Sequence, residues 1–170
     1  MRIAKSRKLG AIFGFPALAG MAFAGIASAT PAIAQLRQTI ANDPGKCTSG
    51  SAVAVTITDV KPGGGTLRVQ LYRSTSDDWL EKGRWIHRIE LPAKSGTMNV
   101  CMPVPQAGTY GIAVRHDVNQ NGKTDLREDG GGMSNNPSIN IFNLGKPSYK
   151  KTAIAVGNAP KAIRIQMRYW

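Results

Sequence analysis

The segment of this chain that is richest in chemistry is residues 116–128, HDVNQNGKTDLRE. Counted from Asp117, oxygen-bearing side chains stand at positions 1, 3, 5, 9 and 12, and glycine stands at position 6. This is the pattern D-x-N-x-N-G-x5-E of an EF-hand calcium loop, in which alternate side chains converge on one point as the chain curls. We therefore predict a Ca²⁺ site with six ligands, of which Lys123 contributes its backbone carbonyl: Asp117, Asn119, Asn121, Lys123, Asp125 and Glu128.

The flanks of this loop are not those of an EF-hand. An alternating strand pattern, 109–115, enters the loop, and a glycine run, 130–132, follows where a helix would continue. We therefore expect an EF-hand-like loop between strands. Its affinity for Ca²⁺ should be modest because two asparagines replace acids, and the bound Ca²⁺ should be structural, ordering a long loop. Two alternatives stay open: an Asx-rich turn that binds no metal, and completion of the shell by Asp129 instead of Glu128.

The sequence contains no recognisable catalytic motif, so we expect a non-enzymatic protein. His87 and His116 lack the further ligands of a zinc site and the partners of a nucleophile, and both are expected to be structural. The alternative is an enzyme acting on an envelope glycan, in which Asp117, Asp125 or Glu128 would work as acid and base. That chemistry requires two carboxyl groups that face each other across a cleft at ~5–9.5 Å.

Two further groups of side chains could contact a ligand, and we expect neither to do so. Tyr72, Trp79 and Trp85 are predicted to pack in the core, although an exposed strip for a glycan or peptide is the alternative. Asp77 and Asp78 have the character of solvated turn residues.

The first 34 residues have the pattern of a secretory signal peptide. A basic start precedes an apolar run over 9–26, and small-x-small cleavage sites occupy 27–29 and 32–34. We predict cleavage after Ala34 and a periplasmic or secreted mature protein. An uncleaved anchor is the alternative, because ~20 apolar residues can span a bilayer.

The mature chain would carry 18 basic and 10 acidic residues, a net charge of +8. Such a charge favours anionic surfaces. The basic residues are scattered and are not interleaved with aromatics as in a base-stacking platform, so we do not expect nucleic-acid binding. The expected partner is envelope polysaccharide or another envelope protein.

The two cysteines, Cys47 and Cys101, are the only pair available in an oxidising compartment, and we predict that they form a disulfide. In the chain-entropy estimate a bond across this separation stabilises the fold by ~3–4 kcal/mol.

Strand patterns dominate after residue 50, separated by Gly/Pro-rich turns, and no strong helical period is present. A single all-β sandwich domain is therefore predicted over 51–170, with a small barrel as the alternative. Residues 35–50 are predicted to be a loosely held N-terminal segment. The seven expected strands are 51–59, 66–72, 84–91, 97–104, 109–115, 151–156 and 162–169.

Four segments together carry a resemblance to a known family: 108–110 (GTY), 116–125 (HDVNQNGKTD), 132–136 (GMSNN) and the last strand, 163–169. Over roughly 51–169 the chain resembles the domain of unknown function family 2141, whose members are small exported bacterial proteins. The resemblance implies an immunoglobulin-like or transthyretin-like sandwich and no particular activity. Relatives usually continue after the loop into a Gly-x-Pro-x-Glu segment, which is absent here.

Overall fold

The computed structural model describes residues 37–125, 127–139 and 145–169. The predicted signal peptide, 1–34, lies outside these residues. Within the described ranges, no helix is both long enough and apolar enough to cross a membrane.

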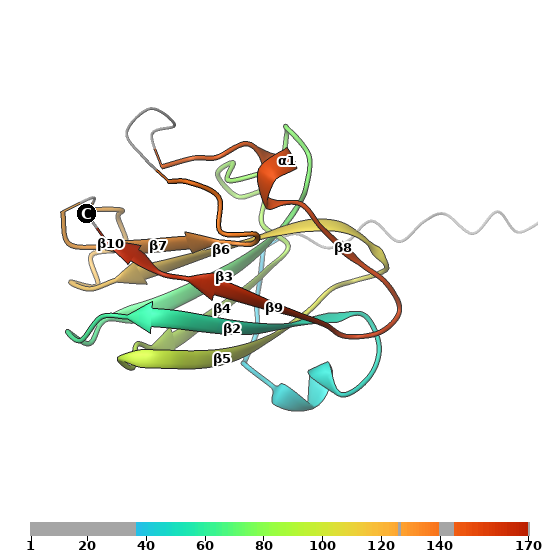
Figure 1. Ribbon diagram of the computed structural model, residues 1–170, viewed down its shortest axis with the longest axis horizontal. Helices are drawn as coiled ribbons and strands as arrows, with labels where there is room; N and C mark the ends of the chain where they lie inside the picture. Colours follow the sequence, from blue (N-terminus) through green and yellow to red (C-terminus); the bar gives the residue numbers. More distant parts are fainter. Residues whose placement is uncertain (1–36, 126, 140–144, 170) are drawn as a thin grey trace, which may run out of the picture. The chain divides into compact units, whose positions relative to one another are not determined.

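The described residues form ten strands and two short helical turns (Figure 1). The helical turns are a 3-10 helix, η1 (Pro44–Cys47), and α1 (Tyr149–Thr152). The strands are β1 (Gln38–Thr39), β2 (Ala52–Val60), β3 (Thr66–Arg73), β4 (His87–Pro92), β5 (Gly96–Pro103), β6 (Gly108–Asp117), β7 (Gly130–Met133), β8 (Ile154–Val156), β9 (Lys161–Gln166) and β10 (Arg168–Tyr169).

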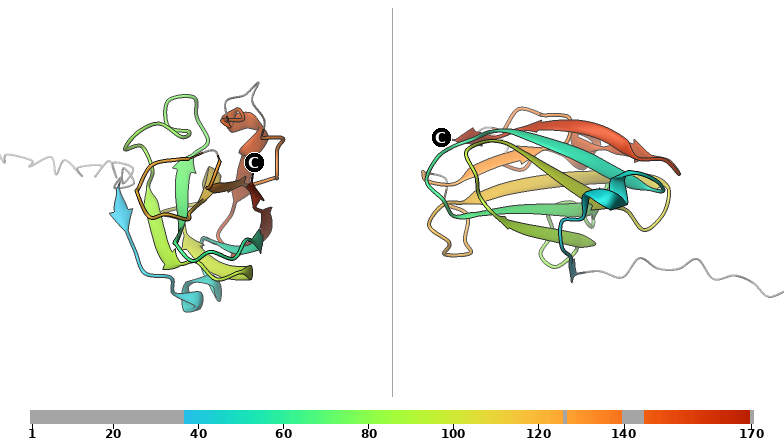
Figure 2. Two further views of the ribbon diagram at one scale, coloured as in Figure 1. Left: turned by 90° about the vertical axis from the view of Figure 1, so that its left-hand side faces the viewer. Right: turned by 90° about the horizontal axis from the view of Figure 1, so that it is seen from below.

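These strands make two sheets that lie as separate layers, which confirms the predicted all-β sandwich (Figures 1 and 2). The larger sheet has the order β1-β4-β3-β6-β7-β10, with β8 also paired to β6. The smaller sheet has the order β5-β2-β9, in which β2 runs antiparallel to β5 and parallel to β9.

The main core fills the space between the two sheets. Alternation along each strand sends every second side chain inward, as the sequence predicted. The smaller sheet contributes Val53, Val55, Ile57, Val100, Met102 and Ile165, and the larger sheet contributes Leu67, Val69, Leu71, Ile89, Ile112 and Val114. Each buried aliphatic side chain of this kind stabilises the fold by ~1.5–3 kcal/mol.

All seven predicted strand segments contain strands, and the last one is divided into β9 and β10. The strands β1 and β7 were not predicted. β7 is Gly-Gly-Gly-Met, without the branched or aromatic side chains that indicate a strand. A side chain at Gly130 would collide with the Tyr169 ring, and a Cβ at Gly132 would lie 2.7 Å from Ile165, so glycine lets β7 pack closely.

A second cluster of buried side chains lies outside the main core and contains Tyr72, Trp79 and Trp85 together with Met133. The prediction that these aromatics are packed rather than exposed is therefore confirmed. The Trp79 indole N–H donates to the Pro147 carbonyl at 2.8 Å.

The expectation that Asp77 and Asp78 are both solvated turn residues is wrong for Asp78. This side chain is buried and forms ion pairs with Arg73 at 3.5 Å and with Arg84 at 2.7 Å. The two arginines compensate the negative charge of the buried Asp78 carboxylate. Asp77, in contrast, is exposed.

Residues 37–50 are attached to the rest of the domain at both ends of this segment. β1 pairs in parallel with β4, and the Ile40 N–H donates to the Arg88 carbonyl. Cys47 at the end of η1 forms the predicted disulfide with Cys101 of β5. The bond closes a loop with a sequence separation of 54.

Removing this disulfide is expected to destabilise the domain without changing its topology. In the double variant Cys47→Ala/Cys101→Ala, the free energy of unfolding in urea should fall by ~3–4 kcal/mol, because the unfolded chain loses a long covalent loop. An unchanged urea midpoint, with the wild-type protein shown by mass spectrometry to carry the bond, would contradict the expectation.

Candidate functional site

The predicted calcium loop connects two paired strands of the larger sheet. β6 ends at Asp117 and β7 begins at Gly130. The two strands are antiparallel, with Arg115 opposite Gly131 and His116 opposite Gly130. Both ends of the loop are therefore fixed by the sheet, and only the intervening residues are left to arrange ligands.

Asp117, the first residue of the loop pattern, is buried, with 3% of its surface exposed. Its Oδ2 atom accepts the Gly122 N–H at 3.0 Å and pairs with Arg115 at 3.0 Å. Gly122 has a φ of 76°, so a tight left-handed turn brings the middle of the loop back onto its first residue. The other oxygen, Oδ1, is buried and has no hydrogen-bond partner among the residues that the structure describes.

Four further predicted ligands are brought together by hydrogen bonds. The Asn119 amide nitrogen donates to Asp125 Oδ2 at 3.1 Å and to Glu128 Oε2 at 2.7 Å. The Asn121 amide nitrogen also donates to Asp125 Oδ2. These amide bonds hold the pKa of the Asp125 carboxyl below its usual value, with smaller contributions from the positive charges of Lys123 and Arg115.

Two carboxylates thus lie within hydrogen-bond reach of one nitrogen. An amide nitrogen between two carboxylates occupies the kind of position that a cation would take, and rotation of the amide by half a turn would present its oxygen instead. The Lys123 side chain is exposed, and its backbone N–H donates to Asn121 Oδ1 at 2.7 Å.

Glu128 and Asp129, the two candidates for the last ligand, differ in their surroundings. Asp129 has 1% of its surface exposed, and its two oxygens accept the N–H groups of Val118 at 3.1 Å and of Asp125 at 3.0 Å. Its carboxylate therefore fastens the end of the loop to the beginning. Glu128 is exposed, and its carboxylate contacts Asn119.

Arg115 is the one residue of this region that the sequence analysis missed. Its guanidinium donates to the Gly122 carbonyl at 3.2 Å, to Thr124 Oγ1 at 3.1 Å and to Asp117 Oδ2 at 3.0 Å. Burial and the nearby charge of Arg68 lower the pKa of this guanidinium. Strand periodicity could have identified Arg115 from the sequence. Residues two apart in a strand lie on the same face, so Arg115 and Asp117 are neighbours on one face of β6.

The donor set of the loop fits a hard cation such as Ca²⁺. Carboxylate and amide oxygens are the ligands that Ca²⁺ takes, and an orphaned buried oxygen at the first position would gain a partner. Over the described ranges, no group of three or more His, Cys, Asp or Glu side chains is placed to hold a metal ion. Arg115 already supplies a positive charge at the base of the loop and would compete with the metal there.

A buried hydrogen-bond network holds the base of the loop. His116 is fully buried, and its Nε2 lies 2.6 Å from the Gly64 carbonyl, which can only accept a hydrogen bond. Nε2 therefore donates this bond, and Nδ1 accepts a hydrogen bond from the Tyr169 hydroxyl at 2.8 Å. The Tyr169 oxygen accepts the Lys61 N–H at 3.0 Å, so every group in the network has a partner. Both ring nitrogens of His116 thus have partners within the fold.

The fold and this loop define a two-sheet β-sandwich with an oxygen-rich connection between the central strands of its larger sheet. The model of a family of uncharacterized proteins conserved in bacteria, DUF2141, matches residues 55–164. The chain belongs to this family. Neither a curated protein nor a solved structure matches it.

The His116 network predicts that one hydroxyl group at the end of the chain matters for stability. Tyr169→Phe should lower the free energy of unfolding by ~1–3 kcal/mol, because it leaves His116 Nδ1 and the Lys61 N–H buried without a partner. Tyr149→Phe is the matched control, since the structure gives the Tyr149 hydroxyl no hydrogen bond to a described residue, and it should change stability by less than ~0.5 kcal/mol. Equal urea midpoints for the two variants would refute the role of the network.

Proposed function

We propose that this protein is an exported, non-enzymatic β-sandwich that binds Ca²⁺ in the loop 117–128 and serves as a binding or structural module of the cell envelope. The observation that carries the proposal is Asp117 Oδ1, a buried carboxylate oxygen without a described partner at the first position of a complete calcium-loop pattern. The metal would be held by Asp117, Asn119, Asn121, Asp125 and Glu128 together with the Lys123 carbonyl, and it would order the connection between β6 and β7.

Glu128 is the better candidate than Asp129 for the last ligand. The Asp129 oxygens already accept two backbone N–H groups, and Asp129 is buried away from the exposed side chains of the loop. Glu128 is joined through Asn119 to Asp125, so its carboxylate is on the side where the other side chains converge.

Export to an oxidising compartment is supported by two independent features. The disulfide between Cys47 and Cys101 is the kind of bond that persists outside the cytoplasm. The basic and apolar start of the chain has the organisation of a signal peptide. We infer a periplasmic or secreted protein whose basic surface meets envelope polysaccharide or another envelope protein.

Binding is favoured over glycan hydrolysis by the placement of the acids. Asp125 and Glu128 share one loop and are joined by Asn119, rather than facing each other across a cleft. Asp129 is the one acid among the described residues that line the cavity on the outer face of the larger sheet. Acid–base catalysis on a glycoside needs two such groups on opposite sides of the scissile bond.

Calcium binding should raise the stability of the protein. For an affinity of the extracellular class, Kd ~10⁻⁴–10⁻³ M, Ca²⁺ at about 10 mM should stabilise the fold by about 1.4–2.7 kcal/mol. Asp125→Asn and Glu128→Gln should weaken binding measured by calorimetry by about tenfold or more. Glu81→Gln, an exposed acid outside the loop, is the matched control and should bind as the wild type does.

The absence of a saturable heat and of any shift in melting temperature up to about 10 mM Ca²⁺ would overturn the calcium proposal, because that range covers the weakest extracellular sites. The loop would then be an Asx-rich turn closed by Arg115 and Asp129 alone.

The proposed cleavage site can be tested separately. The protein recovered from an exporting bacterium should begin at Gln35, as measured by intact mass and N-terminal sequencing. Ala34→Arg should block processing because the residue before the cut must be small, whereas Ala29→Arg should be processed normally. A product that begins at Thr30, or that is sensitive to Ala29→Arg, would assign the cut to the earlier site.

A further inference from the structure

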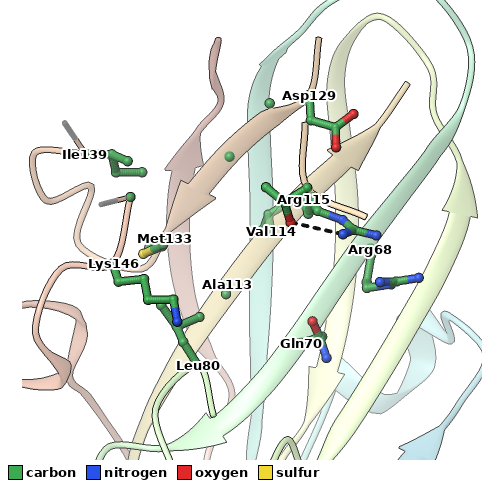
Figure 3. Close-up of a pocket in the computed structure, with 14 residues that line it drawn as sticks. Arg68, Gln70, Leu80, Ala113, Val114, Arg115, Asp129, Met133, Ile139 and Lys146 are labelled. Carbon is green, nitrogen blue, oxygen red and sulfur yellow. Dashed lines mark hydrogen bonds between the residues drawn. The ribbon is translucent and has the colours of Figure 1, made fainter. Parts of the chain in front are cut away.

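A cavity of about 440 Å³ opens on the outer face of the larger sheet, beside the candidate metal loop but distinct from its predicted ligands. Its size is within the range of small-molecule sites in proteins. The residues that line it come from β3, β6 and β7, from the end of the loop, and from the segments that hold Leu80, Ile139 and Lys146 (Figure 3).

The register of the sheet explains why a hollow forms here. Arg68 of β3 lies opposite Arg115 of β6, which lies opposite Gly131 of β7. In the neighbouring row, Gln70 lies opposite Ala113, which lies opposite Met133. The small residues Ala113 and Gly131 leave the face of the sheet open, and the larger side chains around them form walls.

The two sides of the cavity differ in chemistry. Figure 3 shows Leu80, Met133 and Ile139 toward one side, and Arg68, Arg115 and Gln70 toward the other. Lys146 lies on the apolar side, with its ammonium group near Leu80. A ligand that fills the cavity would therefore contact an apolar wall with one part and donors with another.

Several donors that line the cavity have no acceptor among the residues that the structure describes. The Arg68 Nε atom bonds Glu90 at 2.6 Å, but its two terminal nitrogens have no partner among the described residues. The same holds, within those residues, for the Lys146 ammonium and the Gln70 amide. Asp129 is the one acid of the described lining, and its oxygens accept backbone N–H groups, so the balance of charge at the cavity is positive.

We propose that this cavity binds a small amphiphilic carboxylate, with the carboxylate held by Arg68 and Gln70 on the polar side and the apolar body against Leu80, Ala113 and Met133. An arginine fork with a neighbouring amide can recognise such a head group, and a carboxylate gives them an acceptor that the described residues do not supply. The apolar wall selects a ligand with a compact hydrocarbon body over a bare anion. None of the six residues proposed as metal ligands lines the cavity, so decanoate binding can be measured without the metal.

The test compares decanoate with decan-1-ol, which has the same chain and no charge, by ¹H–¹⁵N NMR titration of the protein produced from the full chain. EDTA is present throughout, so that failure of the calcium proposal cannot affect the result. Decanoate should bind saturably and shift the amide signals of Arg68, Ala113 and Gly131. Decan-1-ol should bind about tenfold more weakly or not at all. Equal affinities, absence of binding, or shifts confined to another face would overturn the proposal.

Variants locate the two halves of the site. Arg68→Gln should weaken decanoate binding by about tenfold through loss of a charged donor, and Gln70→Ala should weaken it by about threefold through loss of a neutral donor. Ala113→Leu should abolish binding by filling the hollow. Lys94→Gln, an exposed lysine between β4 and β5, is the matched control and should bind as the wild type does. If Ala113→Leu does not fold, the Arg68→Gln and Gln70→Ala variants still decide, because affinities equal to that of Lys94→Gln would refute the site.

Discussion

The position of β6 is the constraint on which the other features of this domain depend. It pairs with the whole length of β3 on one edge and with β7 and β8 on the other, so the register of this one strand decides which of its side chains face the core and which face outward. The inward face supplies Ile112 and Val114 to the core, followed by the buried ring of His116. The outward face supplies Ala113 to the cavity and then Arg115 and Asp117 to the loop. A slip of one residue would exchange these faces and place two charges in the core.

Arg115 sets the electrostatic character of the loop. Its guanidinium pairs with one oxygen of Asp117 and donates to the Gly122 carbonyl and to Thr124 Oγ1. The turn therefore contains a positive charge even without a bound metal ion. A divalent ion would gain the attraction of the remaining acids but would also meet this fixed positive charge. Repulsion at such short range lowers affinity, and the expected site is therefore one that fills at extracellular calcium concentrations and stays empty at cytosolic ones.

The strands that could be predicted from the sequence are those whose side chains alternate clearly, such as Val53, Val55 and Ile57 in β2. The glycine strand β7 was missed because its residues favour no strand, and it exists through pairing with β6 and close packing against Tyr169. The oxygen-bearing residues of the loop and their spacing could be read from the sequence alone. The roles of Arg115, Asp78 and Asp129 were not, because each depends on which partner the folded chain brings to a buried charge.

The disulfide has a consequence for the order of events when the chain is made. In a chain that crosses a membrane N-terminus first, as proposed above, Cys47 emerges 54 residues before Cys101. Until Cys101 has crossed, the Cys47 thiol is on the far side of the membrane without its native partner. During this time it can react with an oxidant or form a disulfide with another chain. The bond can close only after β5, an edge strand of the smaller sheet, has also crossed the membrane.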